Sequence, residues 1–273
     1  MLIKKIVNKM DLIGRFEKIL NENNNKSYKD NVIGVLSEKT LHKTIKNLYE
    51  DNQAYQEIKI DGYYVDILKD NNIIEVQTKQ FDKFRNKLIY LLDNYDYSIN
   101  VIYPVFNHKV IYYIDEHNNV SLPKNSPKKL KYPEVFYELY KIKSLLTNDK
   151  LKITLLVLDI NEYRMKSNNR KKYVLLDRIP IKLVEEVKLF NKEDYLNLLP
   201  NNLKEIFTVK DICELTKCDN KYVSKMVNVL KYIGVIEMIG KEGKRYLYRI
   251  KKGWFNKNRP FILLLLRRDD VDG

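Results

Sequence analysis

Apolar residues in the first fifty positions recur with the period of a helix. One such face, with steps of three or four, is formed by Leu2, Ile6, Met10, Ile13, Phe16 and Leu20. The polar run NENNN at 21–25 ends it, which predicts a packing helix over 1–24. In SEKTLHKTIKNLYE, residues 37–50, Ser37 is a suitable N-cap and Glu38 falls in the first turn. A second helix is therefore expected after Ser37, with its apolar face at Leu41, Ile45 and Leu48.

From Tyr55 onward the period changes to that of strands. Three strands are predicted in YQEIKID (55–61), YYVDILKD (63–70) and IIEVQTKQF (73–81), with turns at Gly62 and at Asn71 and Asn72. A helix in DKFRNKLIYLLDNY (82–95) follows, and then a strand in SINVIYPVF (98–106), whose near-continuous apolar character suits a strand covered on both faces. The expected order is a helix, an antiparallel meander, a helix and a strand.

The next segments can extend the same sheet. They are a strand in KVIYYIDE (109–116), a basic loop from Pro123 to Pro133, a helix in EVFYELYKIKSLL (134–146) and a very apolar strand in KITLLVLDI (152–160). The basic loop is suited either to contact with a duplex or to solvation alone. We place all of these segments in one domain over residues 1–195, which includes the N-terminal helix.

Beyond residue 195 the pattern changes to short helices, which predicts a second domain over 196–273. FTVKDICEL (207–215) begins with Thr208 as N-cap and Asp211 in a capping-box position. A second helix, KYVSKMVNVLKYI (221–233), follows the turn TKCDN and ends at Gly234. A hairpin comes next, with Gly240 and Gly243 bracketing its tip. The apolar run 261–266 in the tail suggests a packed strand or a partner surface.

Composition narrows the functional classes. With 44% hydrophobic and 32% charged residues, the chain has the composition of a soluble folded protein, and no apolar run reaches the ~20 residues of a spanning helix. We expect no membrane association and a cytoplasmic location, because the N-terminus lacks the pattern of a signal peptide. Cys213 and Cys218, without a nearby His, do not suit a zinc site or a disulfide framework. The net charge of +14 favours a polyanionic partner, although AT-rich codons for Lys, Asn, Ile and Tyr also explain part of it.

Two acids occupy positions inside the predicted meander. On a strand, Glu75, Gln77 and Lys79 share one face, and a tight turn would bring Asp66 on the preceding strand close to Glu75. Two such carboxylates repel unless a cation lies between them, and oxygen-rich sites suit Mg²⁺ or Mn²⁺. Such a metal lowers the pKa of a bound water and binds phosphate oxygens, as phosphodiester hydrolysis requires. The alternative is that both acids face solvent.

Residues 37–106 resemble the PD-(D/E)xK nuclease superfamily, which contains restriction endonucleases. The resemblance implies an α/β (α+β) restriction endonuclease-like core with a mixed central sheet. It further implies Asp66 and Glu75 as metal ligands, the Val76 carbonyl as a further ligand, and Glu38 as an assisting acid on the first helix. Glu38 has an alternative role in favouring the helix N-terminus through the macrodipole, and His42 fits a helix-surface residue better than a base.

The main departure from this family is Gln77, which stands where the family has Lys. A neutral amide supplies no cation to stabilise developing negative charge. Lys79, or Lys83 or Lys87 on the following helix, could supply that charge from a displaced position. Gln77, and Lys79 with it, would then orient the attacking water.

Residues 207–250 resemble a winged helix-turn-helix. In that fold the second helix enters the major groove and the wing contacts backbone phosphates. The expected DNA contacts are Lys221, Tyr222, Ser224, Lys225 and Asn228 on the helix, and Lys241, Lys244 and Arg245 on the wing. A dimerisation or packing role is the alternative for this module.

Together these expectations describe a magnesium-dependent endonuclease acting on duplex or branched DNA, with no organic cofactor. A double-strand cut ordinarily needs two active sites, so a homodimer is among the expected assemblies. Two other functions stay open: a catalytically inactive nuclease fold that regulates through DNA binding, and a module that recruits proteins.

Overall fold

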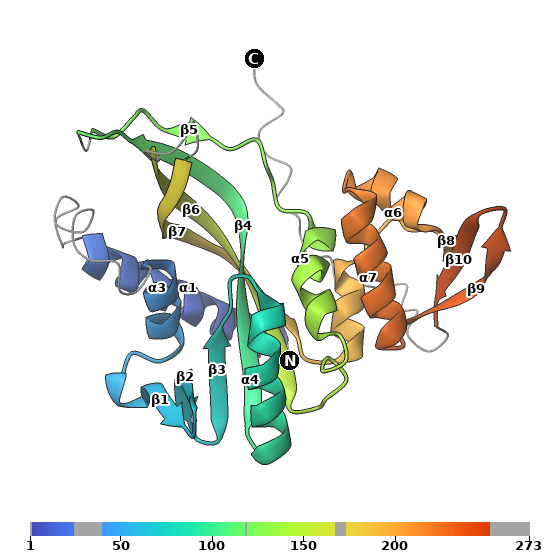
Figure 1. The fold of residues 1–273 in the computed structure, drawn as a ribbon, viewed down its shortest axis with the longest axis horizontal. Helices are drawn as coiled ribbons and strands as arrows, with labels where there is room; N and C mark the ends of the chain where they lie inside the picture. The colour runs from blue at the N-terminus through green and yellow to red at the C-terminus, as the bar shows by residue number, and fades with distance from the viewer. Residues whose placement is uncertain (1, 25–39, 118, 167–172, 252–273) are drawn as a thin grey trace. The chain divides into compact units, whose positions relative to one another are not determined.

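The computed structural model describes residues 2–24, 40–117, 119–166 and 173–251 of the chain (Figure 1). By internal contacts the chain divides into two compact units. The first comprises residues 1–79, 87–130 and 150–188, and the second comprises 80–86, 131–149 and 189–273. The expected boundary after residue 195 stays a prediction.

The first unit is built on a mixed sheet of seven strands. In the order β1-β2-β3-β4-β6-β7, the first three strands form the antiparallel meander, whereas β4 pairs in parallel with both β3 and β6. A short strand, β5, pairs with β4. The strands are β1 (Gln56–Ile60), β2 (Tyr63–Lys69), β3 (Asn72–Val76), β4 (Ser98–Ile114), β5 (Lys124–Asn125), β6 (Leu151–Lys166) and β7 (Tyr173–Leu189). The expected meander and mixed central sheet are confirmed.

Two-residue turns fix the register of the meander. Ile60 pairs with Tyr63 and Lys69 pairs with Asn72, so the second turn consists of Asp70 and Asn71 rather than Asn71 and Asn72. Asp70 and Asn71 have φ values of 47° and 58°. Positive φ at both central residues is the geometry that matches the twist of paired strands, and Asp and Asn tolerate it better than other residues with side chains.

Helices α1 (Leu2–Asn24) and α3 (Thr40–Tyr49) cover one face of this sheet. Phe16, Leu41, Ile45 and Leu48 are at most 3% exposed and pack in one cluster with residues of β3, β4, β6 and β7. Burial of each such side chain stabilises the fold by roughly 1.5–3 kcal/mol. Met10 was expected on the packed face of α1 but is 70% exposed. Ser37 and Glu38 lie outside the described residues.

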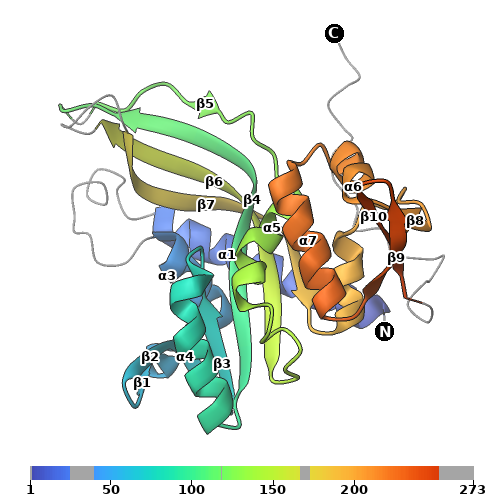
Figure 2. The same cartoon turned by 45° about the vertical axis from the view of Figure 1, so that its right-hand side comes forward.

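The long strands differ from expectation. The two strands expected at 98–106 and 109–116 form a single strand, β4, with a bulge between Phe106 and His108. At the bulge the Asp159 carboxylate accepts hydrogen bonds from the His108 N–H and the Asn107 amide. A bulge leaves backbone groups unpaired, and here a side chain replaces the lost ladder bond. Figure 2 shows β4, β6 and β7 running together.

Helix α4 (Phe81–Asn94) follows the meander, as expected. Its residues 81–86 belong to the second unit and 87–94 to the first. Leu88, Leu91 and Leu92 are at most 3% exposed, which confirms the predicted apolar face. Lys87 begins the part of the helix that belongs to the first unit.

The second unit combines short helices with a three-stranded sheet of order β8-β10-β9. Its elements include α5 (Tyr132–Leu139), the 3-10 helices η2 (Tyr140–Ile142) and η3 (Lys192–Leu198), β8 (Ile206–Phe207), α6 (Val209–Thr216), α7 (Asn220–Tyr232), β9 (Ile236–Glu242) and β10 (Arg245–Ile250). The capping box of Thr208 and Asp211 is confirmed at the start of α6.

The hairpin of this unit turns at Gly243 and Lys244, because Glu242 pairs with Arg245. Gly243 has a φ of +58°, which a side chain would strain. Gly240 was expected beside the tip but lies within β9, where it pairs with Leu247 next to a bulge.

Among the described residues, no helix combines the length and apolar character needed to cross a bilayer. Cys213 and Cys218 are both free thiols.

Candidate active site

The site lies where β2 and β3 separate. Their backbone pairing is recorded from Lys69 and Asn72 as far as Ile67 and Ile74, and one further step of this register would set Asp66 opposite Glu75. On their other edges β2 pairs with β1, and β3 pairs with β4 as far as Val76 and Ile102. At the separation the Val76 N–H donates to Asp66 Oδ2 at 2.7 Å. The Asp66 carboxylate therefore takes the place of a backbone acceptor.

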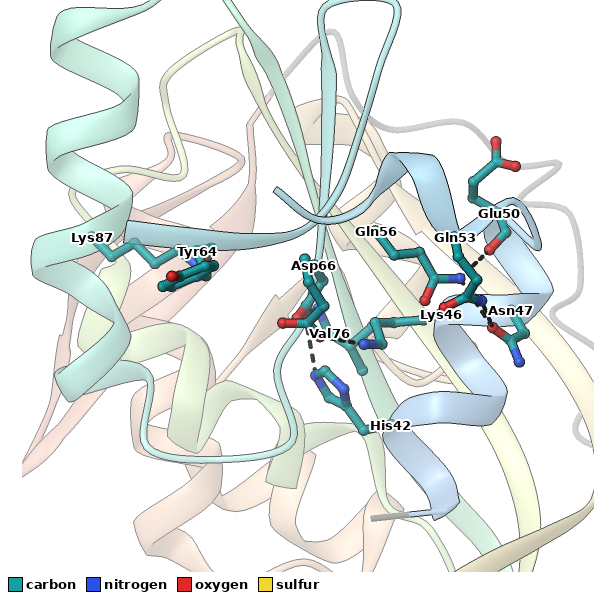
Figure 3. A network of polar contacts seen from close by, with 11 residues as sticks. His42, Lys46, Asn47, Glu50, Gln53, Gln56, Tyr64, Asp66, Val76 and Lys87 are labelled. Atoms are coloured by element: carbon teal, nitrogen blue, oxygen red, sulfur yellow. Dashed lines mark hydrogen bonds and ion pairs between the residues drawn. The ribbon is translucent and has the colours of Figure 1, made fainter. Parts of the chain in front are cut away.

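Asp66 is held by two donors. The side chain is 15% exposed, and Nε2 of His42, on α3, lies 3.2 Å from Oδ2 (Figure 3). Burial opposes ionisation of Asp66, but His42 and the Val76 N–H outweigh it and hold the pKa of the carboxyl below its ordinary value. Asp66 is thus an anion at neutral pH.

The carboxyl of Glu75, in contrast to that of Asp66, has a raised pKa. The residue is 3% exposed, and burial raises the pKa of its carboxyl to about 7, with the charge of Asp66 adding to the effect. The ammonium of Lys87 lies 2.5 Å from Oε1 and partly offsets that rise. Oε1 is buried, and the Lys87 ammonium is the partner recorded for it among the described residues. At neutral pH this carboxyl is close to half ionised.

Lys87 is itself positioned by the meander. Its Nζ donates to the carbonyl oxygen of Tyr64 on β2, and the side chain is 17% exposed. Its ammonium, from the second turn of α4, therefore lies at the buried carboxyl of Glu75. Lys79, Lys83 and Lys87 were the candidates for supplying the charge that Gln77 lacks. Of these, Lys87 is the one recorded in an ion pair with Glu75.

The solvent-facing alternative for the two acids is wrong, since Asp66 and Glu75 are both largely buried. Gln77 and Lys79 lie beyond the end of β3 at Val76, so strand alternation does not set them beside Glu75. The Gln77 amide instead donates to the Lys79 carbonyl at 2.5 Å, and the Lys79 residue is exposed.

His42 was expected at the helix surface, yet it contacts Asp66. Its position on α3, one turn after Glu38, was the only signal in the sequence. Glu38 itself lies outside the described residues. The expected convergence of Glu38, Asp66 and Glu75 on one metal ion therefore stays a prediction.

Candidate ligands for a divalent metal can be compared with this geometry. Within the described residues, no group of three or more His, Cys, Asp or Glu side chains is arranged to hold an ion. Asp66 and Glu75 nevertheless supply two neighbouring carboxylates, each largely buried. A donor set of this chemistry fits a hard, oxygen-preferring cation.

The expected DNA contacts on α7 are partly engaged within the second unit. The Tyr222 ring packs 5.9 Å from that of Tyr137, and the Lys225 ammonium lies 5.4 Å from the same ring. Asn228 accepts a hydrogen bond from Lys143 at 2.8 Å. Lys221 and Ser224 are exposed. Part of the helix face that was expected to read DNA therefore packs within the second unit.

On the hairpin, Lys241, Lys244 and Arg245 are all exposed, and the Lys241 ammonium lies 4.5 Å from the Tyr246 ring centre. The apolar run at 261–266 lies outside the described residues.

Comparison with known proteins gives a family without an assigned activity. Residues 39–190, more than half of the chain, match the family described as "Domain of unknown function (DUF8091)". A protein of Treponema pallidum (strain Nichols), described as an uncharacterized protein, is 24% identical over 235 residues, which cover 84% of this chain and 91% of that protein. No solved structure matches the chain significantly.

Proposed function

The chain belongs to the DUF8091 family, a domain of unknown function, and we propose from the geometry of its site that it is a metal-dependent DNA endonuclease of the PD-(D/E)xK type. The observation that carries the proposal is the constellation of Asp66, Glu75 and Lys87 at the separation of β2 and β3. Two acids and one lysine are the residue types of that motif. Here Lys87, from α4, would supply the positive charge that the neutral amide of Gln77 cannot supply.

The matched segment contains every residue of this constellation, because Asp66, Glu75 and Lys87 all lie within 39–190. A buried carboxyl with a strongly raised pKa beside an ionised one is more common at functional sites than elsewhere. Burial of ionisable groups is costly unless they are paired and hydrogen-bonded.

Asp66 and Glu75 would hold the metal, with the Val76 carbonyl and Glu38 as further expected ligands. Bound there, Mg²⁺ or Mn²⁺ supplies Lewis-acid activation of a water and of the scissile phosphate. The chain itself fixes Asp66 through the Val76 N–H and His42, so that this carboxylate needs little reorganisation to bind a cation. The Lys87 ammonium, which donates to the Tyr64 carbonyl, would stabilise negative charge that develops on the phosphate.

For the second unit we propose a winged helix that contacts DNA. Its support is the order β8, α6, α7, β9 and β10, with β8 paired to β10 in one small sheet. Because Tyr222, Lys225 and Asn228 contact α5 and η2, the exposed cations of the hairpin and Lys221 are the contacts this proposal relies on.

A second candidate function is DNA-binding regulation without catalysis. It is favoured by two contacts within the chain, since His42 lies at Asp66 and Lys87 lies at Glu75 and each carboxyl therefore has a partner from the protein itself. In that case the charged site would stabilise the junction of β2 and β3 only.

Cleavage of plasmid, branched and single-stranded DNA with Mg²⁺ or Mn²⁺ distinguishes these functions. The nuclease predicts nicking or cleavage by the parent chain and its loss in Asp66→Ala and Glu75→Ala. Asp93→Ala, which removes an exposed acid of α4, is the matched control and should cleave normally. Folded protein that binds DNA but cuts none of these substrates supports the regulator, and absence of both binding and cleavage would contradict both functions.

A further inference from the structure

A second charged cluster lies on the face of the sheet that also carries α1 and α3. Its centre is Glu162 of β6, which is 1% exposed. Three cations surround this carboxylate: Arg164 Nη2 at 2.5 Å and Arg178 Nε at 2.9 Å from its oxygens, and Lys109 Nζ at 3.5 Å. They come from three neighbouring strands, β6, β7 and β4. The register places Ile111 beside Glu162 and Tyr113 beside Arg164.

The cluster has more positive than negative charge. Within the described ranges, Lys109, Arg164 and Arg178 are each recorded in an ion pair with Glu162 and with no other carboxylate. The nearest acid in sequence, Asp177, accepts hydrogen bonds from the N–H and hydroxyl of Thr40 and from the backbone N–H of Arg178. Three cations against Glu162 and the adjacent Asp177 leave a local charge of about +1, which partly buried surroundings screen poorly.

The two arginines keep donors available for a further anion. Arg178 uses only Nε toward Glu162, which leaves both terminal nitrogens of its guanidinium without a recorded protein acceptor. Its guanidinium lies over the Phe106 ring, with its central carbon 5.0 Å from the ring centre, so its plane is held in place. The side chains of Arg164 and Arg178 are 32% and 27% exposed and can be reached from solvent. A fixed, planar guanidinium with free N–H groups is suited to a phosphate.

The cluster is linked to the candidate active site through α3. Asp177, beside Arg178, binds Thr40 at the first residue of α3, and His42 in the same helical turn contacts Asp66. Asp177 therefore connects the strand that carries Arg178 to the helix that carries His42.

We propose that Arg164, Arg178 and Lys109 form a binding site for a backbone phosphate of a nucleic acid. The identity of this polymer as substrate rests on the proposed nuclease function, but its binding does not require cleavage. The rival explanation is an ion cluster that serves only to neutralise Glu162.

The test is equilibrium binding of labelled nucleic acid by fluorescence anisotropy, in EDTA, over a series of salt concentrations. The variants are Arg164→Gln and Arg178→Gln, with Lys18→Gln as control, since Lys18 is exposed and lies on α1. Each cation that contacts a phosphate of B-form DNA contributes about 0.9 to the slope of log K against log salt. We expect that slope to fall by about that amount in each arginine variant and to stay unchanged in Lys18→Gln. Duplex DNA, single-stranded DNA and duplex RNA are compared to identify the source of the phosphate.

Removal of one arginine could leave Glu162 poorly compensated and unfold the protein. The double variant Glu162→Gln with Arg164→Gln removes both partners of the pair and is expected to fold and to show the same reduced slope. Unchanged slopes in folded variants, or no binding by the parent chain, would overturn the proposal. Reduced slopes in the variants, without any cleavage by the parent chain, would support the phosphate site and contradict the nuclease function. Cleavage by the parent chain with unchanged slopes would support the nuclease function and contradict the phosphate site.

Discussion

Replacement of Glu75 by glutamine should stabilise the protein above neutral pH and have little effect in acid. Burial raises the pKa of this carboxyl from 4.5 to about 7, so the folded state retains the proton more strongly than the unfolded state. The stabilisation from this proton is complete below pH 4.5 and is lost as pH rises through 7. Since one pKa unit corresponds to roughly 1.4 kcal/mol, the ionised Glu75 costs about 3 kcal/mol above pH 7.

Glutamine imitates the protonated acid in size and neutrality, so Glu75→Gln removes this cost. At pH 8 Lys87 faces an ionised Glu75 in the parent chain and a neutral amide in Glu75→Gln. The pKa of about 7 already includes this attraction, so the cost of about 3 kcal/mol is a net value. Thermal unfolding at pH 8 should show Glu75→Gln more stable than the parent chain by up to about 3 kcal/mol, or roughly 6–12 °C. At pH 4.5 the two should unfold within about 1 °C of each other. A variant that is less stable at pH 8, or a difference that does not depend on pH, would refute the assignment of Glu75 as a strained, buried acid.

Three further predictions concern the metal, the cap and the core. Mg²⁺ at a hundred times its dissociation constant should raise the stability of the parent chain by about 2.7 kcal/mol and leave Glu75→Gln nearly unchanged, as measured by thermal unfolding with and without EDTA. Thr208→Ala removes the hydroxyl that accepts the Asp211 N–H and should cost about 1 kcal/mol in urea denaturation, whereas exposed Ser224→Ala on α7 should cost less than half of that. Ile45→Ala opens a cavity at a residue that is 0% exposed and should cost about 2–5 kcal/mol, with Ile45→Val below about 1.5 kcal/mol as the volume control.

Local signals in the sequence predicted most individual elements correctly. The meander follows from period-two alternation with turn residues, and α6 follows from the Thr208 and Asp211 pattern, because both are determined by residues a few positions apart. The division of β4 into two expected strands was wrong. Asn107 and His108 look like a loop, but the bulge there is held by Asp159, a residue of a neighbouring strand.

The site was also predictable in part, because some of its contacts join residues that are close in the sequence. Asp66 and Glu75 come together through a short turn, so their proximity is local. The contacts of His42 and Lys87 depend on how α3 and α4 pack against the sheet, which periodicity alone does not determine. Strand β7 was missed altogether, because its alternation is mixed and much of it is half exposed.

The account depends most on Lys87, rather than Gln77, as the source of positive charge beside Asp66 and Glu75. Its most direct test is the rate of plasmid cleavage at saturating Mg²⁺ by Lys87→Met and by Gln77→Ala, each compared with the parent chain. Loss of a preorganised charge of this kind lowers turnover by roughly 10²–10³-fold, and we predict that loss for Lys87→Met and a change below about tenfold for Gln77→Ala. Full activity of folded Lys87→Met, or a large loss confined to Gln77→Ala, would contradict the account.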